Sequence, residues 1–480
     1  MHRVNVRRSI SINFATRYIE HGLALVSGIV LARWLTPEDF GIYSIAASVV
    51  LIGYLFRNFG VGQFIVQAKE INDDILRAAF SVTLVVSWGI GLGFVALAPF
   101  LGSFYEEEGV TVVLYFLSFN FFLLPFGSVT NSLLRREMLF EKIAVIDICA
   151  AVASLVVGLT AAWFGASYLS IAWAANASTL VSIIVTLLYR RPETPWLPGV
   201  NRFREIFTFG VKVGAMDLSN SGTDAVTELT IGRAHGLHDL GIYSRAYGTF
   251  KLFEFAFAQT IRPVVLPYLS KSKHDDQNLG EIYLNIISLT SIVTIPFFTF
   301  LGVNAAEVIG LLYGGQWGAA VPVLQIMCVA GVLFAPTLFF EQLLIANGRP
   351  GQAARFIVQA QALRLLALFI LAWVSLEAAA VALSVGFIAR IFLLTRMARQ
   401  HFSLNGVDFL RRVAPAVLAA VLLGTTTAGV RYLALPWDSA FLSLLATGTT
   451  AALIWLGTVF LLSHPITGEM RGVVARVTGR

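Results

Sequence analysis

The chain has 480 residues, of which 57% are hydrophobic and only 13% are charged, about half the charged fraction of a typical soluble domain. The formal net charge of +6 comes from basic residues scattered between apolar runs, and such scattering does not form the basic face that nucleic acid requires. The composition therefore excludes a soluble protein and a nucleic-acid partner, and predicts an all-α protein that crosses a membrane many times.

Apolar runs separated by short segments with charged residues, Pro or Gly predict about fourteen transmembrane helices. The stretch from Glu307 to Gly315 is too short to cross a bilayer and is predicted to be a re-entrant turn or an interfacial piece. The predicted helices begin near Phe14, Gly41, Ala79, Val110, Ile143, Ser167, Ile206, Gly241, Ile282, Trp317, Gln352, Leu376, Val413 and Ala440.

The order of these helices predicts two six-helix bundles, over residues 1–189 and 206–400. A polar cytoplasmic linker over residues 190–205 joins them. Residues 401–480 add two further transmembrane helices and a cytoplasmic tail.

Lys and Arg are distributed unequally between the predicted loops. Of the 34 basic residues, eight fall within predicted spans, three (Arg33, Arg233 and Arg431) fall in outer loops, and the other 23 fall on the cytoplasmic side when the N-terminus is cytoplasmic. This asymmetry follows the positive-inside rule. Both termini are therefore predicted to be cytoplasmic.

The sequence contains an internal repeat at an offset of 200 residues. The segment LARWLTPEDFGIYS (Leu31 to Ser44) aligns with IGRAHGLHDLGIYS (Ile231 to Ser244), with six identities in fourteen positions. Each segment lies between the first and second predicted helices of its half, so a unit of about six helices has been duplicated. Parallel repeats of this kind are a transporter design, with the substrate site at the repeat interface near the middle of the membrane.

Charged residues inside predicted spans are costly and indicate function, and eleven of the fifteen here fall in the first two helices of each half. Four sets share a helix face or a helix end, and we expect these faces to line a water-filled path. The alternative is that the charges pair with one another, for instance Arg17 with Glu20 or with Asp217. The sets are Arg17, Glu20 and His21; Tyr54, Arg57 and Asn58; Asp217, Asn220, Ser221, Asp224 and Glu228; and Lys251, Glu254 and Arg262. The remaining embedded charges are Asp147, Lys212, Arg245, Glu341, Arg364 and Arg390.

The sequence lacks the motifs of several enzyme classes. It has no Gly-Lys dipeptide and hence no P-loop, and it has no His-Glu-x-x-His or Gly-x-Ser-x-Gly motif. Its two cysteines, Cys149 and Cys328, lie in apolar runs without metal-ligand spacing. We therefore expect no enzymatic activity, no metal and no cofactor.

Several segments resemble the polysaccharide transporters of the multidrug/oligosaccharidyl-lipid/polysaccharide exporter superfamily. They are ARWLTPEDFGIYS with the following FRNFGVGQFIVQ, its echo GRAHGLHDLGIYSRA, and ANGRPGQAARF. The resemblance implies two six-helix bundles around a central cavity, and two trailing helices. It also implies a bacterial cytoplasmic-membrane flippase that moves polyprenyl-pyrophosphate-linked oligosaccharide repeat units by alternating access.

The resemblance places arginines of the first, second and eighth helices near the pyrophosphate, which matches Arg17, Arg57 and Arg262 here, and Lys251 adds a further cavity cation. The implied partners are the lipid-linked oligosaccharide, membrane lipid and a polysaccharide polymerase or export complex. The alternative function is a multidrug exporter of the same superfamily coupled to Na⁺ or H⁺, with Asp217, Asp224 and Glu228 as a cation relay.

Overall fold

A computed structural model describes most of the chain, and every regular element in the described part is a helix. The all-α prediction is therefore confirmed. The backbone is described for residues 6–57, 61–191, 194, 197–433, 440–462 and 466–468, and side chains are described there except at residues 6–11, 13, 209–221, 255, 432 and 433.

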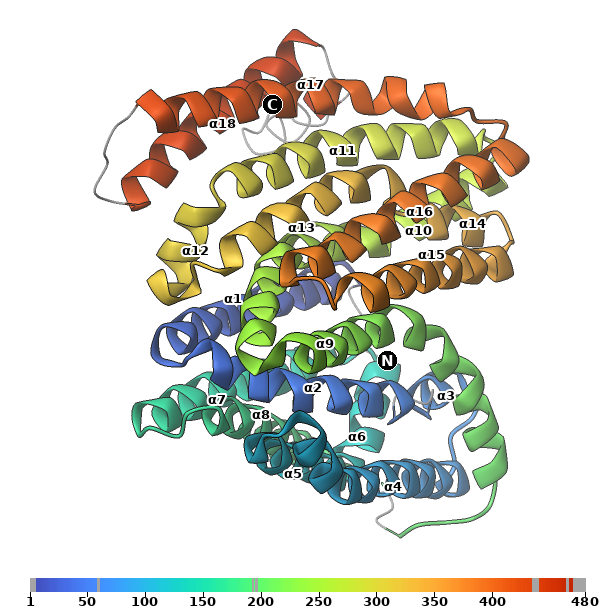
Figure 1. The fold of residues 1–480 in the computed structure, drawn as a ribbon. Coiled ribbons are helices and arrows are strands. Elements are labelled where there is room, and N and C mark those ends of the chain that lie inside the picture. Colours follow the sequence, from blue (N-terminus) through green and yellow to red (C-terminus); the bar gives the residue numbers. More distant parts are fainter. Residues whose placement is uncertain are drawn as a thin grey trace. The chain divides into compact units, whose positions relative to one another are not determined.

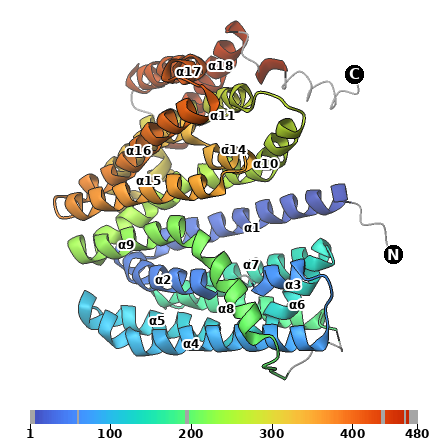
Figure 2. The same ribbon diagram turned by 90° about the vertical axis from the view of Figure 1, so that its right-hand side faces the viewer.

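The chain forms two compact units, of which the first comprises Met1–Ser244. Within it α7 packs along α8, and α4 packs along α5 (Figure 2). Its helices are α1 (Val6–Trp34), α2 (Pro37–Arg57), α3 (Val61–Gln67), α4 (Asp73–Tyr105), α5 (Glu108–Leu123), α6 (Pro125–Arg136), α7 (Phe140–Trp163), α8 (Leu169–Leu188) and most of α9 (Phe203–Phe253).

The second unit comprises Arg245–Arg480. Its most extensive helix pairs are α11 with α17 and α15 with α16 (Figure 1). Short 3-10 turns at Gly315–Trp317 and Ala335–Thr337 interrupt the series. The helices after α9 are a π-helical turn (Glu254–Ala258), α10 (Gln259–His274), α11 (Leu279–Val303), α12 (Ala305–Tyr313), α13 (Ala320–Phe334), α14 (Phe340–Ala346), α15 (Pro350–Leu371), α16 (Leu376–Phe402), α17 (Gly406–Leu433) and α18 (Ala440–Leu461).

By length and composition, ten of the described helices can cross a membrane, or eleven if α5 and α6, bent by 54°, form one span. The chain is thus a multi-pass membrane protein, but the predicted number of fourteen spans is not confirmed. Helices α1 and α9 are long enough but carry embedded charges, and neither is among the ten. The stretch from Glu307 to Gly315 lies in the nine-residue α12 (Ala305–Tyr313) and the turn after it, and α12 is too short to cross a bilayer. Its assignment as a re-entrant turn or an interfacial piece stays a prediction.

Local sequence signals explain several helix ends. Asn72 caps α4 by accepting a hydrogen bond from the Ile75 amide at 3.0 Å, and Ser375 caps α16 in the same way. Helix α9 changes direction at Gly236, where φ is +82°. This backbone region favours glycine because a side chain would clash there, so Gly236 divides α9 into a first and a second arm.

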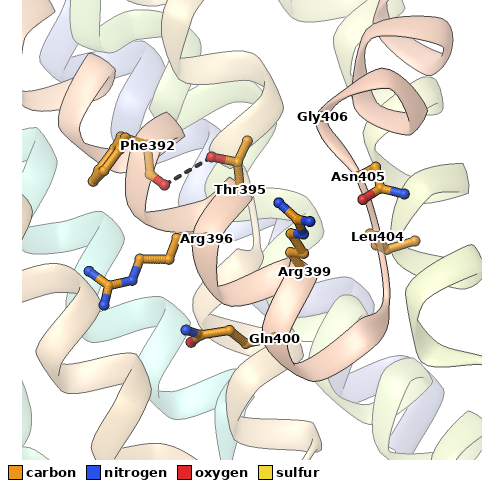
Figure 3. Close-up of a pocket in the computed structure, with 8 residues that line it drawn as sticks. All are labelled: Phe392, Thr395, Arg396, Arg399, Gln400, Leu404, Asn405 and Gly406. Carbon is orange, nitrogen blue, oxygen red and sulfur yellow. Dashed lines mark hydrogen bonds between the residues drawn. The ribbon is translucent and has the colours of Figure 1, made fainter.

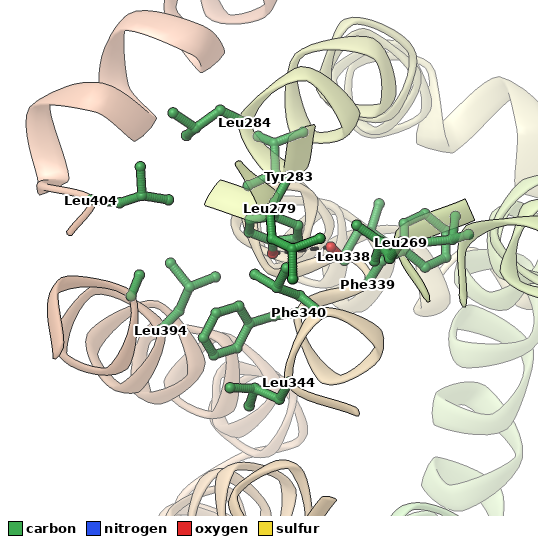
Figure 4. Packing of buried hydrophobic residues seen from close by; sticks show 14 of the residues in the cluster. Leu269, Leu279, Tyr283, Leu284, Leu338, Phe339, Phe340, Leu344, Leu394 and Leu404 are labelled. Atoms are coloured by element: carbon green, nitrogen blue, oxygen red, sulfur yellow. Dashed lines mark hydrogen bonds between the residues drawn. The ribbon is translucent and has the colours of Figure 1, made fainter. Parts of the chain in front are cut away.

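The core of the second unit contains a cluster of buried apolar residues from α10, α11 and α14 to α17 (Figure 4). Tyr283 is fully buried at its centre and packs against Phe340 and Phe409. Its hydroxyl donates a hydrogen bond to the carbonyl oxygen of Leu338 at 3.1 Å. This bond satisfies the one polar group of a side chain that is otherwise held by apolar contacts.

We expect Gly331→Ala to lower the thermal unfolding midpoint of the purified protein. The new Cβ would lie 2.4 Å from the ring of Phe298, a buried side chain on α11 that cannot easily move aside, and such overpacking costs about 1–3 kcal/mol. Gly457→Ala in α18 is the matched control because its Cβ would meet nothing within 4 Å. Equal midpoints for the two variants in a thermal unfolding assay would contradict the packing of α11 on α13.

Candidate functional site

The charged face of α1 meets charged residues of α7 inside the first unit. Glu20 is half-buried, and its charged neighbours are Asp147 of α7 and Arg17. One carboxylate oxygen of Glu20 is buried and receives no hydrogen bond from any residue described. Arg17 and His21 are exposed. Asp147 is visible in the sequence as an embedded charge, but its place beside Arg17 and Glu20 is not, because only the packing of α1 on α7 brings them together.

The C-terminal end of α2 carries the second predicted set. The ring of Tyr54 stacks on Phe121 of α5, with 4.9 Å between the ring centroids. Arg57, the last residue of α2, is half-buried and is a charged neighbour of the Tyr54 hydroxyl. Asn58 lies outside the described residues.

The first arm of α9 presents Asp224 and Glu228 one helical turn apart, and both are half-buried. The hydroxyl of Ser48 on α2 donates a hydrogen bond to the Glu228 carboxylate at 2.6 Å. Ser48 is not recognisable as a site residue from the sequence, since nothing in the pattern of α2 distinguishes this serine from others that face the core. Three further predicted residues of α9 lie outside the described side chains: Asp217, Asn220 and Ser221.

Where the repeat segments meet, they form an unusually close contact between α2 and the second arm of α9. A Cβ atom on Gly41 would lie 1.8 Å from the carbonyl oxygen of Leu237, and one on Gly241 would lie 1.8 Å from the carbonyl oxygen of Pro37. The two contacts are related by the 200-residue offset of the repeat. Contacts that are reciprocal in this way are those of a two-fold symmetric interface. Only glycine permits such a close approach of backbones.

A direct bond joins the same two segments one turn further along. The hydroxyl groups of Ser44 and Ser244, which are equivalent positions of the repeat, are hydrogen-bonded at 3.1 Å. We call Gly41, Ser44, Gly241 and Ser244 the repeat junction. The predicted topology places it at the outer end of the helices.

Side chains around the repeat junction hold the neighbouring helices in place. The Tyr105 hydroxyl at the end of α4 donates to the carbonyl oxygen of Leu229 at 2.9 Å, and the guanidinium of Arg233 lies 5.1 Å from the Phe104 ring centroid. Asp39 accepts hydrogen bonds from the Thr36 amide and hydroxyl at 2.8 Å each. The first two contacts join α4 to α9, and the third fixes the start of α2.

The second unit contains a separate charge cluster of three arginines and two glutamates. Arg262 of α10 is exposed, and its guanidinium lies 3.9 Å from the Glu341 carboxylate of α14. Arg390 of α16 is half-buried, with its guanidinium above the rings of Phe356 and Phe387. The charged neighbours of Arg390 are Glu341, Arg364, Arg262 and Glu254.

Only two members of this cluster, Glu254 and Arg262, were assigned to the site from the sequence. Glu341, Arg364 and Arg390 are visible there as charges within apolar runs, but they belong to helices outside the duplicated pairs, and only the fold places them beside Arg262. Glu254 begins the π-helical turn that precedes α10, and such turns are frequent at functional sites. Nearby, the Lys251 ammonium lies 4.8 Å from the Tyr247 ring centroid.

No group of three or more His, Cys, Asp and Glu side chains that could hold a metal occurs in the described part of the chain. The described side chains of the charged sets on α1, α2, α7 and α9 and of the cluster in the second unit carry guanidinium, ammonium, imidazole, carboxylate and hydroxyl groups. Such groups can bind a polar ligand by charge and hydrogen bonds.

A family model of polysaccharide biosynthesis proteins matches residues 30–322, which is more than half of the chain. The chain belongs to this family. The match includes the repeat junction and the charged face of α9, and it ends before α14 to α16, which carry Glu341, Arg364 and Arg390.

Relatives of this polysaccharide biosynthesis protein include the lipopolysaccharide biosynthesis protein WzxC of Escherichia coli, 26% identical over 70% of this chain and 69% of the relative. The succinoglycan biosynthesis transport protein ExoT of Rhizobium meliloti is 23% identical over 70% of this chain and 68% of the relative. The probable low-salt glycan biosynthesis flippase Agl15 of Haloferax volcanii is 21% identical over 75% of this chain and 76% of the relative.

Solved structures share the fold. The lipid II flippase MurJ in an inward closed conformation superposes with a TM-score of 0.77 and 12% identity, over 96% of this chain and 99% of that one. An inward-facing multidrug resistance transporter of the MATE family superposes with a TM-score of 0.67 and 14% identity, over 82% and 98%. These likenesses show that the polysaccharide biosynthesis protein shares the fold of these two structures.

We expect Ser44→Cys with Ser244→Cys to form a disulfide under mild oxidation. The two hydroxyl oxygens are 3.1 Å apart, so sulfur atoms at these positions can reach bonding distance with little backbone movement. The background is Cys149→Ser with Cys328→Ser, which removes both native thiols. A protease site is engineered between the two positions. After cleavage, the two fragments stay together on a non-reducing gel only when the disulfide has formed.

The matched control is Ser48→Cys with Ser244→Cys, since Ser48 lies one turn, about 6 Å, along α2 from Ser44. Equal cross-linking of both pairs would contradict the register of the repeat junction.

Proposed function

We propose that this protein flips a polyprenyl-pyrophosphate-linked oligosaccharide across the bacterial cytoplasmic membrane by alternating access, with both termini in the cytoplasm. The observation that carries the proposal is the placement of half-buried charged side chains on membrane helices of both units, because bilayer-spanning helices do not retain such groups without a function. Membership of the polysaccharide biosynthesis family and the names of its relatives support this substrate class.

The substrate has three chemically different parts, and each would need its own surroundings. The pyrophosphate would bind Arg17, Arg57, Lys251 and Arg262, since guanidinium groups match phosphate oxygens in pairs. The sugars would be hydrogen-bonded by Tyr54, Asn58, Asn220 and Ser221. The polyprenyl chain would stay in the apolar core of the bilayer, so that its movement between leaflets would expose no apolar surface to water.

Carboxylates beside the basic residues would allow release as well as binding. Glu20 and Asp147 accompany Arg17, and Glu341 accompanies Arg262. A translocated ligand must bind strongly enough to enter and weakly enough to leave. When the pyrophosphate departs, the acidic groups would take its place as partners of the arginines, and the membrane potential would act on the same charges.

The repeat junction would close the outer end of the path while the cavity is open to the cytoplasm. The contacts among its four residues and their neighbours include two backbone approaches at glycine and one hydroxyl pair. Separation of α2 from the second arm of α9 would break them together and expose the path to the outside. The small size of these contacts suits an interface that must open in every cycle.

We expect Arg17→Ala and Arg262→Ala each to reduce polymer export at least about ten-fold, because each removes charge-assisted hydrogen bonds worth about 1.5–3 kcal/mol. Export is measured as surface polysaccharide in a strain that lacks the native gene, and the amount of variant in the membrane is measured in parallel. Arg202→Ala, which removes an exposed arginine beyond both charge clusters, is the matched control.

Unchanged export by both variants would contradict the roles of Arg17 and Arg262.

The gene deletion tests the substrate class separately. A flippase leaves lipid-linked oligosaccharide on the cytoplasmic leaflet when it is lost, and a partner polymerase then receives none. Deletion of a cation-coupled multidrug exporter would instead leave the polymer intact and raise drug sensitivity, and Asp217, Asp224 and Glu228 would form its cation relay.

We expect the Ser44→Cys, Ser244→Cys disulfide to stop export and reduction of the disulfide to restore it, because a closed repeat junction would block the outward-open state. The rate of lipid-linked oligosaccharide translocation in vesicles is measured before and after addition of dithiothreitol. Each single cysteine variant is the control and should retain transport under both conditions. Transport by the fully cross-linked protein would refute the gating role.

A further inference from the structure

A cavity of about 590 Å³ lies where α16 ends and α17 begins, in the second unit (Figure 3). This volume is within the range of small-molecule sites. The cavity is separate from the cluster around Arg262. It is lined by Phe392, Thr395, Arg396, Arg399, Gln400, Leu404, Asn405 and Gly406.

The charged side chains of this lining are both arginines, and its other polar side chains are neutral. The Asp408 carboxylate lies beside the lining, where it accepts a hydrogen bond from the Asn405 backbone amide at 2.8 Å. Arg396 and Arg399 are exposed, and no hydrogen bond or ion pair engages either guanidinium among the described residues. Neighbouring basic residues at the same end of the unit differ: Arg412 pairs with Glu281 at 3.1 Å, and Arg349 lies 2.9 Å from the ring nitrogen of His401. The cavity thus offers two available cations and two side-chain amides, a set suited to a phosphate group.

The apolar side chains next to the cavity are exposed, as side chains that contact membrane lipid are. On α16, Ile388 and Phe392 are 54% and 64% exposed, and they precede Arg396 on one helix face at intervals of four residues. On α17, Val407 and Leu410 are 57% and 72% exposed. The boundary between this apolar surface and the two guanidiniums is where a membrane would change from acyl chains to headgroups.

We propose that the cavity binds an anionic phospholipid, with its phosphate on Arg396 and Arg399 and its acyl chains along Ile388 and Phe392. The positive-inside distribution predicts that this end faces the cytoplasm, where the leaflet surface carries negative charge and basic pockets between helices hold acidic headgroups. A dissolved anion would use the guanidiniums but not the exposed apolar face. This inference does not depend on which substrate the protein transports.

The test is native mass spectrometry of the delipidated full-length protein titrated with phosphatidylglycerol or phosphatidylcholine. The wild type is expected to retain phosphatidylglycerol preferentially. Arg396→Gln with Arg399→Gln should weaken that binding about 30-fold, as expected for the loss of two basic side chains near an anionic surface. Arg202→Gln with Arg204→Gln removes the same charge from exposed positions elsewhere and should leave the binding unchanged.

Three results would overturn the proposal. One is equal retention of phosphatidylglycerol by the cavity variant and the wild type. Another is an equal loss in the Arg202 and Arg204 control, which would show a general charge effect. The third is displacement of the lipid by excess inorganic phosphate, which would identify a site for a dissolved anion. Arg396→Lys with Arg399→Lys keeps the charge and should retain most of the binding, so a folding defect in the Gln variant does not leave the question open.

Discussion

The structure depends on the cost of placing ionised side chains among apolar helices. A single embedded charge costs a few kcal/mol in a membrane, yet this chain keeps arginines, a lysine, aspartates and glutamates inside its bundles. Several of the described charges lie beside a group of opposite sign, as Arg17 does beside Glu20 and Arg262 beside Glu341. Mutual neutralisation lowers the cost of burial, and the remaining exposure keeps these groups able to bind a ligand.

In the proposed transport cycle, the repeat junction and the charge clusters would have different tasks, and their chemistry differs accordingly. The junction uses small residues, so that backbones approach closely and separate without leaving a charge unpaired. The clusters use long, ionised side chains that can exchange partners without large backbone movement. A translocation path needs both, because a seal made of strong ion pairs would open slowly, whereas a binding surface made of glycine and serine would attract no phosphate.

Membrane lipid has two distinct relations to this fold. The apolar residues exposed on the outer faces of the helices contact lipid without selectivity, as they would in any multi-pass protein. The end of α16 is different because its apolar face leads directly to Arg396 and Arg399, which have no acidic neighbour in the cavity lining. Selectivity for a headgroup arises only where such charges lie at the edge of the apolar surface.

The sequence alone determined the all-α membrane class, because hydropathy is a local property. The number of fourteen spans is not confirmed, and the duplication of a six-helix unit stays a prediction. The sequence also identified Arg17, Glu20, Glu228 and Arg262 as unusual, since a charge within an apolar run is visible without a structure. The division into bundles at residues 190–205 stays a prediction. Only the tertiary structure brought Ser48 to Glu228, Asp147 to Glu20, and Arg390 to Glu341, and revealed that Gly41 and Gly241 approach the backbones of Leu237 and Pro37. These pairings depend on how helices distant in sequence pack, and packing depends on the shape and rotation of each helix, which periodicity along one chain does not specify.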